Sequence, residues 1–206
     1  MSGVITFKAE AREKAGKGAA RAVRRQGLVP GVIYGDKRPP SLIQMDPRQL
    51  MTALQKPGFY TRQYDLELSD GSTHRVLAQD LQLHVVTDAP QHVDFLRINK
   101  DTVVHADVTV EFFNQEKCPG LKKGGVLNVV RHSVQVVSKV NSLPEVFRID
   151  LSELDLGDSV HASALNMPQG VRLTIGDRDF TIASIATPSG LRSETVAETA
   201  TEEVKG

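Results

Sequence analysis

The sequence predicts a mainly β protein with short helices in its first half and an all-β second half. Apolar and polar residues alternate in many short segments, a pattern typical of strands with one buried face. Two segments before residue 60 carry helix-start and helix-end signals, and such signals disappear after about residue 98. With 206 residues, 40% of them apolar, the chain is long enough to fill one large core or two small ones.

The first predicted elements are a strand, a basic helix and a buried strand. Residues 5–10 alternate between apolar and polar side chains. Residues 19–26, which follow Gly16-Lys17-Gly18, are rich in alanine and arginine and favour a short helix, and Gly27 is well placed to end it. Residues 29–35 then indicate a turn that enters a buried strand ending at a glycine.

A second helix and a hairpin follow. Asp46 is a natural N-cap and Pro47 suits the first helical position, so we expect a helix up to about Leu54. Residues 60–68 alternate with period two, which predicts a strand. The Asp-Gly pair at 70–71 then favours a hairpin turn into the next strand.

The second half contains a series of predicted strands. Residues 104–112 alternate and indicate a strand with one wet face, and the glycine-rich segment 120–125 is expected to be a hairpin loop. Shorter strands are predicted at 126–130, 134–137, 147–151, 171–175 and 180–185, with a turn at 176–177. The chain is thereby divided into an N-terminal domain (1–97), a C-terminal β domain (98–186) and an acidic flexible tail (187–206).

The charge distribution suggests a polyanionic partner. The whole chain has 25 basic and 25 acidic residues, yet residues 1–38 hold nine basic against three acidic ones. Between Arg12 and Arg25 six cations accompany a single acid, Glu13, whereas ordinary surface helices intersperse both signs. A merely solvated face is the plainer alternative. We favour polyanion binding through Arg12, Lys14, Lys17, Arg21, Arg24 and Arg25.

Other classes of protein find little support in the sequence. One cysteine cannot form an internal disulfide or a thiolate zinc cluster, and no apolar run is long enough for a membrane span or a secretory signal, so we expect a cytoplasmic protein. His84, His92 and Asp94 lack the spacing of a metal site, and Cys118 has no evident base. We therefore expect no enzyme, no cofactor, no metal and no small-molecule substrate.

Selective contact with a nucleic acid requires groups other than cations. Tyr34 could stack or donate through its hydroxyl, and Gln79 offers an amide that both donates and accepts. His92 and Asp94 could read base or ribose edges. Each alone has a structural alternative; Tyr34 in particular could be a core residue at the end of an apolar strand.

Four sequence blocks closely resemble a known ribosomal family. They are Arg12, residues 16–25, residues 29–35 (Val-Pro-Gly-Val-Ile-Tyr-Gly) and residues 91–95 (Gln-His-Val-Asp-Phe). These blocks resemble the bacterial large-subunit ribosomal protein 25 family, which binds 5S ribosomal RNA. The continuation through residues 120–126, 143–145 and 149–159 is similar to the long, two-domain form, called general stress protein CTC.

The resemblance implies a six-stranded-type β-barrel with two or three helices, followed by an all-β domain. It implies that the barrel docks on the loop E helix of 5S ribosomal RNA, in the company of ribosomal RNA and neighbouring ribosomal proteins. Arg12, Lys17, Arg21 and Arg24 would then contact phosphates and groove edges. Tyr34, Gln79, His92 and Asp94 would complete the surface, with Asp94 accepting hydrogen bonds from RNA or orienting His92.

Two alternatives remain open at this point. One is a free stress-response factor, in which the basic face attracts RNA without selectivity and the β domain binds a protein. The other is an enzyme on the β domain, which is disfavoured because His105, His132 and His161 are scattered without a nucleophile pattern.

Overall fold

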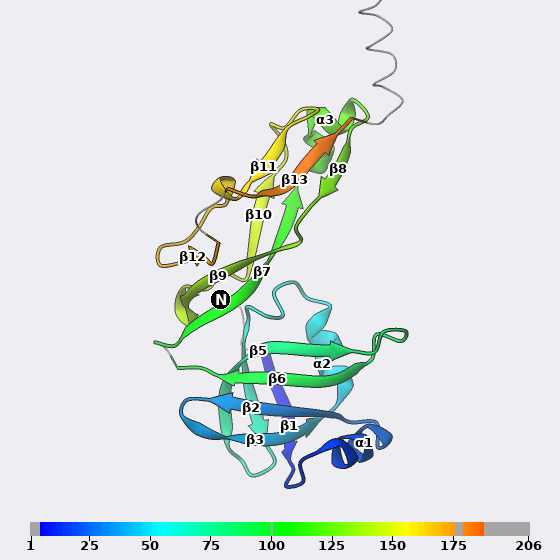
Figure 1. The fold of residues 1–206 in the computed structure, drawn as a ribbon, viewed down its shortest axis with the longest axis vertical. Helices are drawn as coiled ribbons and strands as arrows, with labels where there is room; N and C mark the ends of the chain where they lie inside the picture. The colour runs from blue at the N-terminus through cyan, green and yellow to red at the C-terminus, as the bar shows by residue number, and fades with distance from the viewer. Residues whose placement is uncertain (1–4, 100, 176–178, 188–206) are drawn as a thin grey trace, which may run out of the picture. The chain divides into compact units, whose positions relative to one another are not determined.

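The computed structural model describes residues 5–99, 101–175 and 179–187 (Figure 1). The first six strands form a closed barrel in the order β1-β3-β2-β6-β5-β4. Parallel pairing of β1 with β4 and of β2 with β6 accompanies antiparallel pairing of the other neighbours. This confirms the expected barrel, whose strands are β1 (Ile5–Ala11), β2 (Val29–Gly35), β3 (Arg38–Met45), β4 (Gln63–Leu68), β5 (Thr73–Leu83) and β6 (Pro90–Arg97).

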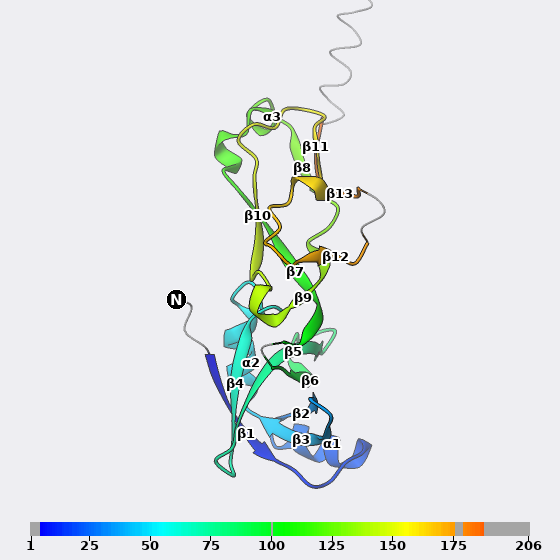
Figure 2. The ribbon, with the colours of Figure 1, turned by 90° about the vertical axis from the view of Figure 1, so that its left-hand side faces the viewer.

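Two helices accompany the barrel (Figure 2). Helix α1 (Lys17–Arg25) ends before Gly27, whose φ of 80° is the left-handed conformation that the sequence predicted for a helix stop. Helix α2 (Pro47–Leu54) begins as expected, because the Asp46 side chain accepts a hydrogen bond of 2.8 Å from the backbone N–H of Arg48.

Aromatic and branched aliphatic side chains fill the barrel. Phe7 stacks on Tyr64 with ring centroids 4.7 Å apart, and both rings are buried. The Tyr64 hydroxyl donates a hydrogen bond of 3.1 Å to the carbonyl oxygen of Phe59. The polar end of this ring is therefore satisfied inside an apolar core.

One predicted strand starts later than its sequence pattern suggests. Alternation begins at Tyr60, but β4 begins at Gln63. Residues 58–62 form a turn instead, because the carbonyl oxygen of Gly58 accepts hydrogen bonds from the backbone N–H groups of Thr61 (3.2 Å) and Arg62 (2.9 Å). Period-two spacing by itself does not show where pairing with a neighbour starts.

The described residues after 102 form two further sheets, in agreement with the predicted C-terminal β architecture. One has the order β10-β7-β9-β12 and the other β11-β13-β8. Their strands are β7 (Val103–Phe113), β8 (Val126–Val129), β9 (Ser133–Lys139), β10 (Val146–Asp150), β11 (Ser159–His161), β12 (Arg172–Leu173) and β13 (Thr181–Ala186). Short 3₁₀ turns cover Gln115–Lys117, Val140–Ser142 and Ala162–Ala164.

The segment 120–125 is not the expected hairpin loop. Helix α3 (Pro119–Lys122) occupies its start, and Gly125 donates a hydrogen bond of 3.0 Å to the Gly120 carbonyl oxygen. A Cβ on Gly120 would lie 2.8 Å from the carbonyl carbon of Asp155, so close backbone packing explains the glycine. The strand predicted at 171–175 is reduced to β12, while the predicted turn at 176–177 and nearly all of the predicted tail lie outside the described residues.

The chain divides into two compact units. Of the described residues, the first comprises 5–99, 101–108, 135–146 and 168–174, and the second comprises 109–134, 147–167, 175 and 179–187. Within the first unit, a small apolar cluster on Leu77 includes Ile98, Val104 and Val140. The domain boundary at 97/98 stays a prediction. Among the described residues, no helix is long and apolar enough to cross a bilayer.

Candidate nucleic-acid interface

Helix α1 presents its cations to solvent. Lys17, Arg21, Arg24 and Arg25 are exposed, while Val23 on the opposite face is buried and the helix contacts β2. Its first turn contains no acidic residue, and two arginines stand in its last turn, where positive charge suits the helix dipole. The arrangement gives a ridge of long cationic side chains that can contact phosphates while the backbone stays helical.

A hydrogen bond joins this helix to the strand that carries His92 and Asp94. The Nε of Arg24 donates to the carbonyl oxygen of Gln91 in β6, at 2.9 Å. Arg24 and Gln91 are 67 residues apart in the chain. The fold therefore brings together the basic helix and the residue directly before His92.

Arg12 braces the connection between β1 and α1. Its Nε donates to the Ile43 carbonyl oxygen and one terminal nitrogen donates to the Lys14 carbonyl oxygen, each at 3.1 Å. Desolvation and, second, the positive charge of Arg24 lower the pKa of Arg12. Arg12 thus belongs to the same cationic group as α1, although part of its donor capacity is used within the protein.

The outer face of β2, β6 and β5 carries the predicted polar readers. Val93 and Phe95 point into the barrel core, so the alternating residues His92 and Asp94 face outward, with side chains 25% and 33% exposed. Tyr34 is partly exposed on the neighbouring strand rather than part of the barrel core. Burial and then the charges of Asp94 and Asp80 raise the pKa of Tyr34, so its hydroxyl stays protonated.

His92 and Asp94 form a close pair. Nδ1 of His92 lies 2.7 Å from Oδ1 of Asp94. That oxygen is buried and accepts no regular hydrogen bond from the described residues. The contact orients the imidazole, and the other carboxylate oxygen of the partly exposed Asp94 side chain, Oδ2, keeps its acceptor capacity for donors such as a base amino group or a ribose hydroxyl.

Asp80 and Gln82 also lie on this face, although the local sequence pattern does not place them there. In the β5–β6 register Asp80 stands opposite Asp94 and Gln82 opposite His92. The pairing shifts between Ala78 and Asp80, so Gln79 is an exposed bulge residue and Asp80 also faces outward. Simple alternation would have placed Asp80 in the core beside Ala78. Because aspartate is rarely buried in a core, its presence at this position could have indicated a bulge in the strand.

The remaining candidates lie at different places on the same unit. Lys14 is exposed in the connection before α1, and Arg25 is exposed at the end of the helix. Gln79 is exposed at the bulge of β5. The structure thus places a cationic helix beside an outer sheet face that carries a tyrosine, a histidine, two amides and two carboxylates.

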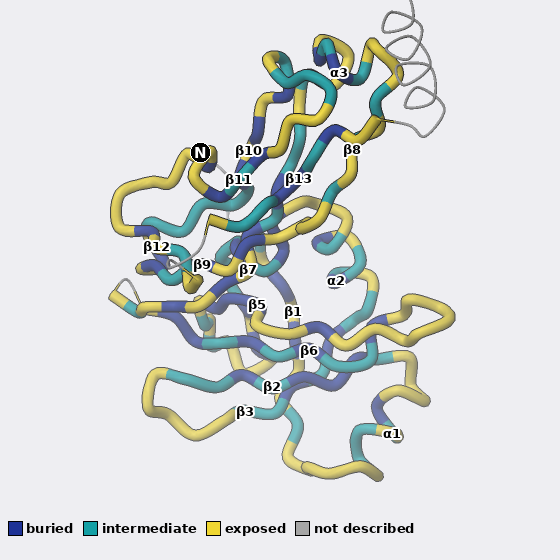
Figure 3. Tube along the Cα trace, turned by 45° about the horizontal axis from the view of Figure 1, so that its top comes forward, coloured by how far each residue is buried: buried dark blue, intermediate teal, exposed yellow. Residues whose placement is uncertain are grey.

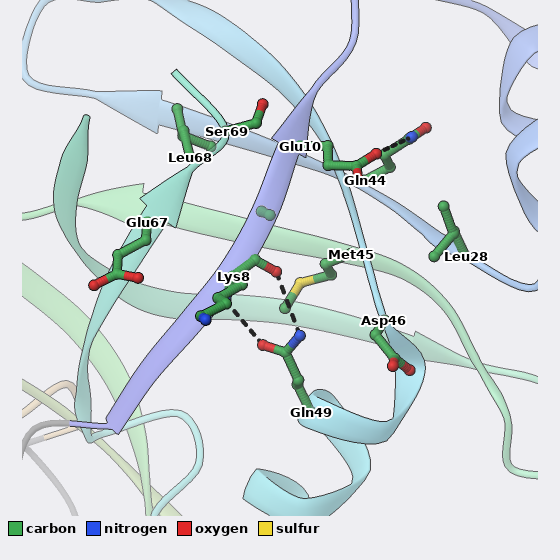
Figure 4. Close-up of a pocket in the computed structure, with 11 residues that line it drawn as sticks. Lys8, Glu10, Leu28, Gln44, Met45, Asp46, Gln49, Glu67, Leu68 and Ser69 are labelled. Carbon is green, nitrogen blue, oxygen red and sulfur yellow. Dashed lines mark hydrogen bonds between the residues drawn. The ribbon is translucent and has the colours of Figure 1, made fainter. Parts of the chain in front are cut away.

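A pocket elsewhere on the barrel has the wrong charge for a polyanion. Residues of β1, β3, β4 and the start of α2 line this pocket, which has a volume of about 460 Å³. Figure 4 shows these lining residues. The Gln49 amide hydrogen-bonds to the backbone N–H (2.8 Å) and carbonyl oxygen (3.5 Å) of Lys8 there. Three acids, Glu10, Asp46 and Glu67, outnumber this one lysine, so phosphate binding is unfavourable.

The alternative chemical sites gain no support. In the described part of the chain no three histidine, cysteine or acidic side chains are grouped as a metal site would require. The His84 Nδ1 accepts the backbone N–H groups of Val86 and Thr87, both at 3.3 Å. Cys118 is buried, and its thiol donates to the Leu154 carbonyl oxygen at 3.2 Å.

Comparison with known proteins covers both halves of the chain. Residues 7–95 match the ribosomal L25p family, and residues 103–189 match the C-terminal domain of ribosomal protein TL5. Among the similar proteins is large ribosomal subunit protein bL25 of Rhodospirillum rubrum, 52% identical over 96% of this chain and 94% of that protein. The protein of the same name from Brucella abortus is 49% identical over 100% of this chain and 99% of its own.

Proposed function

The chain belongs to the ribosomal L25p family, and we propose that its barrel binds 5S ribosomal RNA within the large ribosomal subunit. Membership makes it a structural ribosomal protein and not an enzyme, which agrees with the expectation from the sequence. Its place of action is therefore the bacterial ribosome. The RNA element proposed here is the irregular loop E helix, because a mixture of cations and short polar groups suits a groove with unusual base edges.

The observation that carries this proposal is the hydrogen bond between Arg24 and the Gln91 carbonyl oxygen. It holds the cationic ridge of α1 next to the strand of His92 and Asp94. One RNA stem can therefore meet phosphate-binding cations and groove-reading side chains at the same time. A solvated basic helix alone would not require this attachment.

The proposed contacts fall into two groups. The phosphate-binding group is Arg12, Lys14, Lys17, Arg21, Arg24 and Arg25. The groove-reading group is Tyr34, Gln79, His92 and Asp94, to which the fold adds Asp80 and Gln82. The two carboxylates repel phosphates, so they are expected to face exocyclic amino groups or ribose hydroxyls. They are therefore expected to contribute to selectivity among RNAs and not to general affinity for RNA.

The C-terminal residues are proposed to make a smaller contribution to RNA affinity. Residues 99–206 carry 11 basic and 15 acidic residues, against 14 and 10 in residues 1–98. A net negative charge limits phosphate contact. The division into domains 1–97 and 98–186 with a tail from 187 is part of this proposal.

The test is a competition between two RNAs. Purified 5S ribosomal RNA is bound to the full chain at several salt concentrations, and a plain RNA duplex of equal length competes. We expect 5S RNA to win by at least tenfold at moderate salt, with a log–log salt slope of about −4 to −6. Equal competition by the duplex would favour the alternative of a free stress-response factor with unselective RNA attraction.

A further inference from the structure

The turn between β5 and β6 exposes two adjacent valines. Val85 and Val86 are 96% and 83% exposed, the two highest values among the exposed large apolar residues of the described chain. Figure 3 shows this turn as an exposed protrusion. Two neighbouring branched apolar side chains in water are unfavourable unless something covers them.

The turn holds these valines in a defined position. The backbone N–H of Asp88 donates to the His84 carbonyl oxygen, and that of His84 donates to the Ala89 carbonyl oxygen, both at 2.9 Å. The His84 ring nitrogen accepts two further backbone N–H groups from within the turn. A preformed turn and the few rotamers of valine reduce the entropy lost on docking.

The charge around the turn argues against RNA as the occupant. The turn itself, residues 84–89, contains one acidic residue, Asp88, and no lysine or arginine. Cations come instead from α1, which lies on the same side of the barrel as the turn (Figures 1 and 2). An apolar, uncharged tip beside an acidic residue suits a protein surface better than a phosphate surface.

We propose that Val85 and Val86 dock into an apolar concavity on a neighbouring protein of the large ribosomal subunit. The chain belongs to a protein family of that subunit, so it acts among other ribosomal proteins. The tip follows β5 and directly precedes β6, the strand that bears Gln91 and His92. This inference rests on family membership, not on the identity of the bound RNA.

The test separates protein docking from RNA binding. A V85S/V86S double variant competes with the wild-type chain for large subunits that have been stripped of this protein, and its affinity for free 5S RNA is measured separately. We expect its share of subunits to fall about tenfold or more, because two valine side chains are no longer buried. The affinity for free 5S RNA should stay within twofold of the wild type.

A matched control is available in the second unit. Val126 and Val130 are 59% and 56% exposed, so a V126S/V130S variant removes the same groups elsewhere. It should compete like the wild type, and all three proteins should unfold at the same temperature. Equal competition by V85S/V86S, or a matching loss of free 5S affinity, would overturn the proposal. So would a wild-type dimer that the tip variant dissolves, since the occupant would then be a second copy.

The partner itself can be identified by cross-linking. A photoreactive Val85→p-benzoylphenylalanine variant is assembled into the stripped subunits, irradiated and digested with nuclease. The proposal expects a cross-link to one ribosomal protein, which mass spectrometry identifies at the peptide level. Cross-links to RNA alone contradict it.

Discussion

At the residue scale, His92 and Asp94 are proposed to provide selectivity for 5S RNA over other RNAs, whereas the cations provide general affinity. His92→Ala is expected to lower the preference for 5S RNA over a plain duplex by about 1–3 kcal/mol, the size of one lost base contact. Asp94→Asn removes the charge and keeps the shape, so it should weaken the same preference. The measurement is the ratio of the two dissociation constants. An unchanged ratio in both variants would remove these residues from the RNA surface.

Arg21 and Arg24 are expected to differ in kind. Arg21 is exposed on α1, so Arg21→Ala should flatten the salt slope of 5S binding by about one unit, as for one lost phosphate contact. Arg24 also holds α1 to the Gln91 carbonyl oxygen. Arg24→Ala should therefore lower selectivity as well as slope. Arg24→Lys keeps the charge and serves as the control; identical behaviour of Arg21→Ala and Arg24→Ala would contradict a tethering role.

Tyr64 gives a pH dependence of stability. Burial raises the pKa of its hydroxyl to about 12, above the value near 10 of the unfolded chain. A raised folded-state pKa means that this stability is fully present below pH 10 and is lost as the pH rises towards 12. The loss should approach about 2 kcal/mol in urea unfolding. Tyr64→Phe should be less stable at neutral pH, through loss of the bond to Phe59, and should show a smaller decline above pH 10.

At the element scale, β2 depends on a glycine that lets three strands approach. A Cβ on Gly31 would lie 2.8 Å from both Cγ1 and the carbonyl oxygen of Val93, and 3.2 Å from Cγ1 of Ile43. Gly31→Ala should destabilise the barrel by about 1–3 kcal/mol through overpacking. Gly18→Ala is the control, since no atom lies within 4 Å of its would-be Cβ, and it should not lower stability. Both are measured by urea unfolding; equal stability of the two variants would refute the tight fit.

The β5 bulge shows that the pairing of β5 with β6 determines which residues of β5 face outward. Alternation along 76–82 correctly places Val76 and Ala78 inside, but the shift at Gln79 changes the phase, so that Asp80 is outside and Leu81 inside. One extra residue in a strand is invisible to a period-two pattern. For the same reason, Asp80 and Gln82 could not be recognised from the sequence as neighbours of Asp94 and His92.

At the scale of the whole molecule, the proposed division of labour can be tested by truncation. A chain that ends at residue 98 should bind 5S RNA within about threefold of the full chain, because the proposed RNA surface lies within residues 12–94. It should also be less stable. Val104 and Val140 would no longer cover Leu77, and Glu145 would no longer pair with Arg62 at 2.8 Å. Binding is measured by gel shift and stability by thermal unfolding; a folded but non-binding fragment would refute the division.

The sequence by itself determined the β architecture, the caps of both barrel-side helices, the basic group from Arg12 to Arg25 and the family, because each is written in local spacing or in contiguous blocks. Only the tertiary structure decided that Arg24 reaches Gln91, that Asp80 faces Asp94 and that Val85 and Val86 stand clear of the barrel. Those facts depend on strand register, a bulge and a contact across 67 residues. Local sequence patterns do not encode such long-range geometry, because it is set by how the strands pair once the core has formed.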